Sequence, residues 1–349
     1  MSDRTKNWML CGAAATALIE FIIILVLVLS PPAEKISVQE ISAERLSAPS
    51  VPIKDIVPTG ETESDLEEGQ EEEETESGES EPTILEKEKP AGERSAPEIM
   101  ADAKIVAHGL GTIADLRTPN CMEAFEEAYA NGVRVFEADL RLTRDCQVVL
   151  RHDWWPDTWQ KGIDWARIPT RDKFLSEKIM GKYTPMSFKD LLLLMEKYPD
   201  ICVVTDTKFT ESDVFYIQFD AMVADAHELG LTYLFDRIFI QVYSGNMKTA
   251  VNNVYPFPHY IYTLYQDEDA PFKGTAEDFR KRAAYAKERG IEGLAVNYYW
   301  WKPEFAKIAN EYGIKVYVHT VNNPDTAKRV LAEGAGAVYT DSIWPKDLA

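Results

Sequence analysis

The sequence is short of cysteine and of positive charge, and each shortage excludes a class of protein. It has four cysteines in 349 residues and no Cys-x-x-Cys pair, which excludes a disulfide-dense scaffold and a zinc ribbon. Its 37 basic residues are outnumbered by 58 acidic ones, for a formal net charge of −21. Because proteins that bind nucleic acid neutralise phosphates with basic residues, we expect no nucleic-acid partner. No sequence repeat that would indicate a solenoid is present.

The acidic charge is concentrated near the amino terminus. Residues 1–97 carry 21 acidic and 8 basic residues, and the stretch from residue 33 is rich in Glu, Ser and Pro. This composition is typical of a chain that cannot form an apolar core, so we predict a disordered acidic linker over residues 30–97. Its like charges favour an extended spacer. The alternative, that the acidic run 71–74 binds a divalent ion or a basic partner, stays open.

An apolar run covers residues 10–29, before the linker. About 20 helical residues cross the roughly 30 Å hydrocarbon core of a bilayer, so the run predicts a single transmembrane anchor. The positive charges of Arg4 and Lys6 predict that residues 1–9 form a cytoplasmic tail and that the rest of the chain is extracellular at the cell membrane. Glu20 disfavours insertion, and the apolar residues after it offset that cost. A cleaved signal peptide is the alternative.

The remaining residues, 98–349, alternate short apolar stretches with helical periodicity. The apolar stretches predict eight strands, at residues 105–108, 134–139, 201–206, 237–241, 260–265, 293–297, 315–319 and 337–340. Helical patterns lie between them, at residues 122–131, 188–197, 213–230, 245–253, 276–290, 303–312 and 326–333. Alternating strands and helices are typical of a parallel sheet. Eight strands in a segment close to the roughly 250 residues of a (β/α)8 barrel predict an α/β protein with that closed fold, the TIM barrel.

Polar side chains end several of the predicted strands, on the rim where such barrels carry their chemistry. They are His108, Glu137, Asp139, Asp206, Lys208, Gln241, Asn297, His319 and Asp341, with His152 shortly after the second strand. Glu137 and Asp139 are two residues apart, so both project from one face of their strand. Two such carboxylates repel each other unless a cation lies between them, and Asp206 on the next strand supplies a third oxygen. This pattern predicts one divalent metal ion, Mg²⁺ or Ca²⁺.

The other polar residues of this rim suggest chemistry on a phosphate. Lys208 is two residues from Asp206, faces the same way and would bind an anionic oxygen. His108 and His152 would act as a general acid and a general base. Gln241 and Trp300, which lies in the aromatic run 298–301, are predicted to contact the substrate or its phosphate. For Trp300 a purely structural packing role is the alternative.

At these residues the sequence resembles the glycerophosphodiester phosphodiesterase family, within the phosphatidylinositol-phosphodiesterase-like barrel superfamily. The resemblance covers about residues 103–345, and the ordered set of motifs is specific although each motif alone is weak. The matching segments are 105–109, 120–125, 136–140, 142–145, 152–153, 206–208, 319–322 and 339–341. The resemblance implies that His108 and His152 are the acid–base pair, that Glu137, Asp139 and Asp206 bind the metal, and that Lys208 contacts phosphate.

The sequence departs from the family pattern at four positions. Gly109 stands where the family usually has Arg, Pro119 where it has Glu, Asp206 where it has Glu, and His319 where it commonly has Trp. The lost arginine removes one phosphate contact, for which Arg141, Arg151 or Arg117 would have to compensate. The aspartate at position 206 is similar to the related sphingomyelinase D group, whose members also form cyclic phosphates.

The expected function is therefore a membrane-anchored, metal-dependent phosphodiesterase. The family cleaves a glycerol phosphodiester to glycerol 3-phosphate and an alcohol, and the expected substrate is a small-molecule or lipid phosphodiester. Two alternatives stay open. One is a lipid phosphodiesterase of the phosphatidylinositol phospholipase C or sphingomyelinase D type that forms a cyclic phosphate. The other is a catalytically silent barrel that binds a phosphate polymer.

Overall fold

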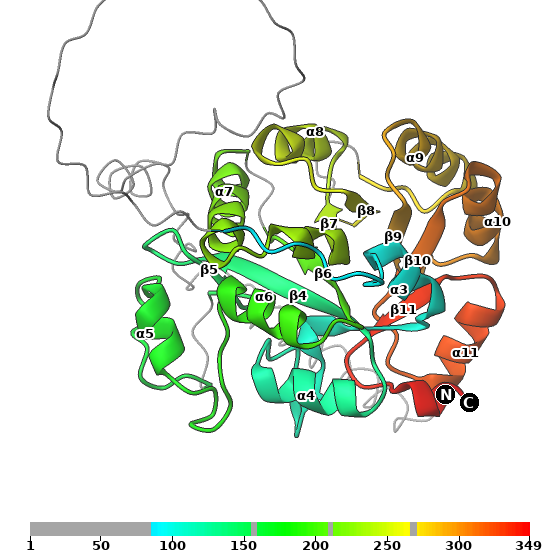
Figure 1. Cartoon of the computed structure of the whole chain (residues 1–349). Coiled ribbons are helices and arrows are strands. Elements are labelled where there is room, and N and C mark those ends of the chain that lie inside the picture. Colours follow the sequence, from blue (N-terminus) through cyan, green and yellow to red (C-terminus); the bar gives the residue numbers. More distant parts are fainter. Residues whose placement is uncertain (1–84, 155–158, 209–211, 266–270) are drawn as a thin grey trace, which may run out of the picture. The chain divides into compact units, whose positions relative to one another are not determined.

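The computed structural model of the protein describes residues 85–154, 159–208, 212–265 and 271–349, which form a closed parallel barrel (Figure 1). Its strands are β1 Ile105–Ala107, β4 Val135–Leu142, β6 Cys202–Asp206, β7 Ile238–Val242, β8 His259–Thr263, β9 Gly293–Asn297, β10 Lys315–His319 and β11 Ala337–Thr340. Each strand pairs in parallel with the next along the chain, and β1 pairs with both β11 and β4, which closes the ring. The predicted barrel is confirmed.

The seven predicted helices surround this ring, with ends within two residues of the expected positions. They are α4 Met122–Ala130, α6 Phe188–Lys197, α7 Ser212–Leu229, α8 Gly245–Val254, α9 Ala276–Glu288, α10 Pro303–Tyr312 and α11 Pro324–Ala332. Local chemistry explains several of the ends. Ser187 and Asp190 form a capping box at the start of α6, and α10 begins with Pro303 and ends at Gly313, which has a φ of +68°.

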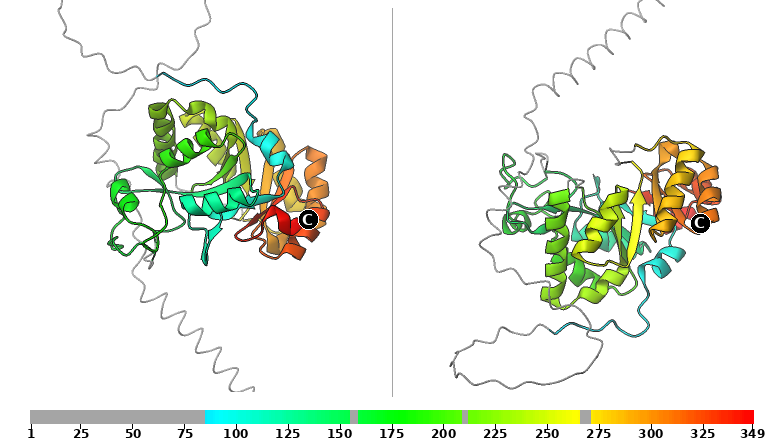
Figure 2. Two further views of the ribbon diagram at one scale, coloured as in Figure 1. Left: turned by 60° about the horizontal axis from the view of Figure 1, so that its bottom comes forward. Right: turned by 90° about the horizontal axis from the view of Figure 1, so that it is seen from above.

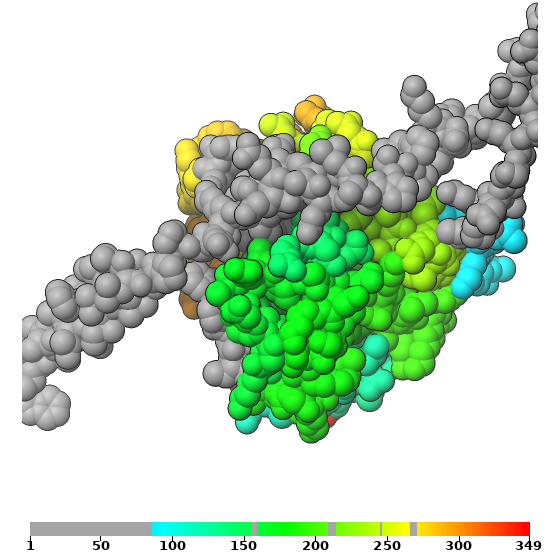
Figure 3. Space-filling model, turned by 90° about the vertical axis from the view of Figure 1, so that its left-hand side faces the viewer, coloured from blue at the N-terminus to red at the C-terminus, as the bar shows by residue number. Residues whose placement is uncertain are grey.

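Several short elements were not predicted. A hairpin of β2 Thr112–Ile113 and β3 Leu116–Arg117 follows β1, and β5 Val148–Leu150 runs antiparallel to the end of β4. This pairing explains why β4 continues three residues beyond its expected end at residue 139. The described residues between β5 and α6, which include α5 Arg171–Ser176, form one side of the domain, where the green residues of Figure 3 lie.

The amino-terminal end of the barrel is closed by a segment that spans the expected boundary between linker and barrel at residue 97. Helix α3 Ala96–Asp102 buries Ala96, Ile99 and Met100 against the apolar side chains that fill the barrel. Residues 85–95 run across this end before the helix (Figure 2). The expected boundary at residue 97 therefore divides a segment that packs as one piece with the barrel.

This amino-terminal segment is held by ion pairs that composition alone does not reveal. Glu93 Oε1 lies 2.8 Å from Arg237 Nη2, and both side chains are almost fully buried. Lys87 Nζ lies 2.6 Å from Glu196 Oε1, and Lys89 pairs with Asp236. The sequence predicts like-charge repulsion in this segment, because its partners Glu196, Asp236 and Arg237 lie more than 100 residues further along the chain.

The predicted anchor at residues 10–29 and most of the predicted linker lie outside the described residues. Among the helices of the described ranges, none is long and apolar enough to cross a membrane.

Candidate active site

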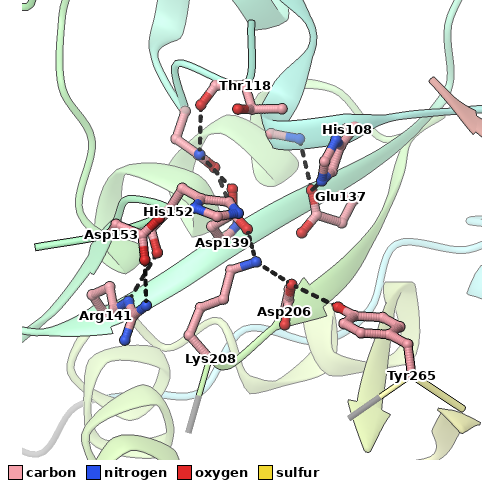
Figure 4. A network of polar contacts seen from close by, with 12 residues as sticks. His108, Thr118, Glu137, Asp139, Arg141, His152, Asp153, Asp206, Lys208 and Tyr265 are labelled. Carbon is pink, nitrogen blue, oxygen red and sulfur yellow. Dashed lines mark hydrogen bonds and ion pairs between the residues drawn. The ribbon is translucent and has the colours of Figure 1, made fainter. Parts of the chain in front are cut away.

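Three buried carboxylates lie at the carboxyl ends of two neighbouring strands. Glu137 and Asp139 project from β4 with exposed fractions of 2% and 0%, and Asp206 ends β6 with 3%. The strands pair in parallel with Asp139 opposite Asp206, which brings the three side chains together (Figure 4). Because buried like charges repel one another, this cluster requires positive groups nearby.

Lys208 supplies one such positive group. Its Nζ lies 2.7 Å from Asp139 Oδ1 and also donates a hydrogen bond to Asp206 Oδ2. Burial favours a lower pKa for Lys208, but the two aspartates outweigh burial and raise its pKa, so the ammonium group stays charged. Burial favours a higher pKa for Asp139, but Lys208, His152 and His108 together outweigh it and lower the pKa of that carboxyl to about 2. Lys208 itself has a φ of +57°, a strained conformation of the kind found at functional sites.

His108 follows β1 and faces the same carboxylates. Its Nδ1 lies 2.8 Å from Asp341 Oδ1, and its Nε2 lies 3.9 Å from Glu137 Oε2. Asn322 Nδ2 donates to Asp341 Oδ2 at 2.6 Å, which fixes the orientation of that carboxylate. Burial opposes the protonation of His108, but Glu137 and the hydrogen bond to Asp341 outweigh it and raise the pKa of His108 to about 9.

His152 reaches the site from the segment that follows β5, and its imidazole is held by two residues. Its Nδ1 lies 2.5 Å from Asp153 Oδ2, and Arg141 Nη2 lies 3.1 Å from the other oxygen of Asp153. Arg141 Nε also donates to the carbonyl oxygen of His152 at 2.9 Å. Almost half of the His152 side chain is exposed, so this imidazole is open to a substrate that enters from solvent.

The structure distinguishes among the three arginines that were expected to replace the missing one. Arg141 lies beside His152 and Asp153, within the site (Figure 4). Arg151 instead lies over the Trp165 ring, with its guanidinium carbon 4.5 Å from the ring centre, and Arg117 is exposed on β3. Of the three arginines, Arg141 is therefore the one that contacts a histidine of the site.

One candidate group for a metal ion shares two members, Glu137 and Asp139, with the predicted set. Among the described residues, one group has its ligand atoms within 4.8 Å of one another: His108, Glu137 and Asp139. Asp206, the third predicted ligand, lies outside this group, and its Oδ2 accepts hydrogen bonds from Lys208 and Tyr265. Buried Glu137 Oε1 and Asp206 Oδ1 have no hydrogen-bond partner within the described part of the chain. Because these spare atoms are carboxylate oxygens, the residues fit Mg²⁺ or Ca²⁺.

Two further residues hold the carboxylates and were not predicted as site residues. Asn120 is fully buried; its Nδ2 donates to Asp139 Oδ2 at 2.8 Å, and its Oδ1 accepts from Asp139 N at 3.0 Å. Gly109 N donates to Glu137 Oε2 at 2.6 Å. A Cβ at Gly109 would lie 2.5 Å from Thr118, so this loop conformation excludes an arginine there. The motif around Asn120 was the available sequence signal, but its contacts depend on a φ of +51° that the sequence does not specify.

The two predicted substrate-binding residues, Gln241 and Trp300, make no hydrogen bond to this cluster within the described ranges, although Gln241 lies level with Asp206 on the neighbouring strand. Gln241 lies in β7 with an exposed fraction of 4%. The Trp300 ring packs on Phe272 with ring centres 5.2 Å apart, which favours the packing alternative for this tryptophan.

A comparison with protein-family models gives one match. Residues 113–344, more than half of the chain, match the model described as the glycerophosphoryl diester phosphodiesterase family. The match includes Glu137, Asp139, His152 and Asp206, and it begins just after His108.

Solved structures share this fold with the chain at low sequence identity. An Oleispira antarctica phosphodiesterase in complex with the product sn-glycerol-3-phosphate is 15% identical, with a TM-score of 0.56, over 71% of this chain and 96% of that one. A glycerophosphodiester phosphodiesterase from Parabacteroides distasonis is 18% identical, with a TM-score of 0.53, over 68% and 92%. A Silicibacter pomeroyi structure with the provisional name of a glycerophosphoryl diester phosphodiesterase is 16% identical, with a TM-score of 0.59, over 72% and 95%.

Proposed function

The chain belongs to the glycerophosphoryl diester phosphodiesterase family, a family of phosphoric diester hydrolases, and we propose that it hydrolyses glycerophosphodiesters to glycerol 3-phosphate and an alcohol. The observation that carries this proposal is the convergence of two histidines, three buried carboxylates and one lysine at one rim of the barrel. The Oleispira antarctica relative was solved with sn-glycerol-3-phosphate, which is the product expected here.

The carboxylates and the lysine would bind the phosphate through opposite charges. Glu137 and Asp139 would hold one Mg²⁺ or Ca²⁺, with Asp206 as the third carboxylate that the family resemblance implies. Such an ion, when bound, offsets the negative charge of the phosphodiester oxygens. Lys208 bridges Asp139 and Asp206, so its ammonium lies beside the phosphate position and would stabilise the charge that grows there during the reaction.

The two histidines would move the protons. Both use Nδ1 to contact an aspartate, His108 with Asp341 and His152 with Asp153. This leaves Nε2 of each ring for the substrate. One histidine would accept the proton of the attacking hydroxyl, from water or from the glycerol, and the other would donate a proton to the leaving alcohol. Attack by the glycerol would give a cyclic phosphate first.

We also propose the setting in which the barrel works. Residues 10–29 would anchor the chain in the cell membrane, with residues 1–9 in the cytoplasm and the barrel outside the cell. The acidic residues between the anchor and the barrel would form a spacer, so that the site reaches either lipid headgroups or soluble phosphodiesters. Protease treatment of intact cells would test this orientation, because it should cleave the barrel from the anchor without lysis.

The proposed activity is tested with the full-length protein in detergent. Glycerophosphocholine, lysophosphatidylcholine and a polyglycerol phosphate are incubated with it, and the products are identified. Metal-dependent release of glycerol 3-phosphate that is lost in His108→Ala and kept in His227→Ala supports the proposal, because His227 lies on α7 outside the described site. A stable cyclic phosphate would instead favour the lipid-phosphodiesterase alternative. Metal binding without turnover of any substrate would favour a binding protein.

A further inference from the structure

The strand ends around the site divide into a charged half and a neutral half. The charged half consists of the ends of β11, β1, β4 and β6 and the segment after β5, which position Asp341, the two histidines, the three carboxylates and Lys208. On the other side, Tyr265 follows β8, Asn297 ends β9 and His319 ends β10, and all three side chains are uncharged polar groups. A phosphodiester needs opposite charge around its phosphate, whereas the alcohol groups on either side of it need neutral partners.

Hydrogen bonds within the protein already occupy two of these three neutral residues. Tyr265 OH donates to Asp206 Oδ2 at 3.4 Å, and Asn297 Oδ1 accepts from Tyr299 N at 2.9 Å. His319 differs, because its Nε2 is buried and has no hydrogen-bond partner among the described residues. Leaving such a buried polar atom unpaired costs free energy, so its persistence requires an explanation.

The surroundings of His319 place its ring beside the reaction site. Its ring packs on Tyr265, with ring centres 4.6 Å apart, and Tyr265 contacts the carboxylate of Asp206. Burial lowers the pKa of His319 to about 3, and the positive charges of His108 and Lys208 act in the same direction. The imidazole is therefore neutral at physiological pH. It offers one N–H donor and one nitrogen acceptor.

We infer that His319 determines substrate specificity by forming a hydrogen bond with a hydroxyl group of the glycerol moiety. A hydroxyl both donates and accepts, so it pairs with Nε2 in either tautomer of the imidazole. An acyl chain or a trimethylammonium group would bury Nε2 without a partner. The tryptophan common at this position in the family would present a larger ring with a single donor. This inference rests on the proposed function, because it assumes a glycerophosphodiester in the site.

The inference predicts a measurable preference between substrates. A glycerol ester that pairs with His319 should react more efficiently than an ester that lacks the paired hydroxyl. Leaving a buried polar atom unpaired lowers kcat/KM by about 10- to 100-fold, from the usual cost of an unsatisfied group. Without His319 the preference should disappear, because no atom is left unpaired by the poorer substrate.

The test uses three chromogenic p-nitrophenyl phosphodiesters, of glycerol, of propane-1,2-diol and of propane-1,3-diol. Each diol lacks one of the two free glycerol hydroxyls. The full-length wild-type protein should prefer the glycerol ester over at least one diol ester. His319→Phe should reduce this ratio of kcat/KM values to near one, and His319→Gln, which keeps a donor and an acceptor, should restore part of it. His227→Phe is the matched control and should leave the ratio unchanged.

The outcomes separate this inference from the function on which it rests. If the wild type hydrolyses none of the esters, the proposed function fails and the inference fails with it. If the wild type shows the preference and His319→Phe retains it, the inference alone is overturned. Thermal melting of each variant establishes folding, and His319→Gln carries the comparison if His319→Phe does not fold. A wild type that hydrolyses all three esters equally well also overturns the inference.

Discussion

The two ends of the barrel bury charge in opposite ways. At the amino-terminal end, Arg237 is 1% exposed; it pairs with Glu93 and donates hydrogen bonds to the carbonyl oxygens of Met195, Tyr198 and Ile201. At the carboxyl-terminal rim, the three buried carboxylates of Glu137, Asp139 and Asp206 lie close together, with Lys208 as the cation that bridges two of them. One end balances each buried charge, and the other concentrates charge of one sign.

This difference indicates separate roles for the two ends. A buried ion pair stabilises the fold only when both partners are present. The Glu93–Arg237 pair therefore holds residues 85–95 to the barrel. Concentrated carboxylates cost stability, and they are kept where a cation or a substrate repays that cost. Mutations at the rim should therefore change activity, whereas mutations at the other end should change stability.

The largest expected effect is on turnover, from the rim histidines. His108→Ala or His152→Ala should reduce kcat by about 10²- to 10⁴-fold, because each removes one proton-transfer group. Steady-state kinetics on the best substrate would measure the loss, and His227→Ala serves as the control. Near-wild-type rates in both rim variants would contradict the assignment of these histidines. They would also contradict the claim that the rim serves activity.

The next effect is on stability, from the amino-terminal pair. Glu93→Gln should lower the free energy of unfolding by about 3 kcal/mol, because it leaves the buried Arg237 guanidinium without its counter-charge. Urea unfolding would measure this change, with Glu88→Gln in the same segment as the control, because Glu88 is exposed. Turnover per folded molecule should stay unchanged. A loss of turnover equal to that of the rim variants would contradict the claim that this pair affects stability alone.

A smaller effect of opposite sign is expected at the rim. Burial and the neighbouring Asp139 raise the pKa of Glu137 to about 8, so its charge is disfavoured in the folded protein. Glu137→Gln should therefore raise the free energy of unfolding in EDTA by about 1 kcal/mol while removing activity. Calorimetric melting would check the gain, with the exposed Glu126→Gln as control. A destabilised variant would show that the carboxylate cluster carries no strain.

The smallest effect concerns a histidine at the start of β8. His259 lies between Glu292, 2.9 Å away, and Asp236, 3.5 Å away, while Asp236 also pairs with Lys89 and the Phe239 ring packs on the imidazole. Burial favours a lower pKa for His259, but its carboxylate partners outweigh burial and raise it.

The sign of the resulting pH dependence follows from the raised pKa. The stabilisation is complete below the unfolded pKa of about 6.5 and is lost as the pH rises through the folded pKa. His259→Asn should cost up to about 1 kcal/mol of unfolding free energy at pH 5.5, and less at pH 9. Urea unfolding at both pH values would show the difference. A cost that grows with pH would contradict this account of the pair.

Much of the fold was predictable, because each strand and helix has a local pattern. The i, i+2 spacing of Glu137 and Asp139 also predicted a shared face, and the structure confirms it. The barrel itself then brings Asp206 and Lys208 beside them, because parallel strands end at the same rim. The position of the charged cluster can therefore be predicted from strand and helix patterns that each extend over a few residues.

Other features depend on contacts that no local pattern encodes. His108 and Asp341 are separated by 233 positions in the chain, and their contact exists only because β1 pairs with β11. The left-handed backbone of Asn120 decides which carboxylate it holds. The charged stretch before α3 looks solvated in the sequence, since Glu93 has its partner at Arg237, far along the chain.

The most direct test of the account follows hydrolysis while metal is restored to EDTA-treated protein. Wild type, Glu137→Gln and Glu93→Gln are titrated with Mg²⁺ or Ca²⁺ under conditions where each is folded. The account predicts that activity returns with metal in the wild type and in Glu93→Gln and stays absent in Glu137→Gln. Full activity in EDTA, or metal-dependent activity in Glu137→Gln equal to that of the wild type, would contradict the central claim.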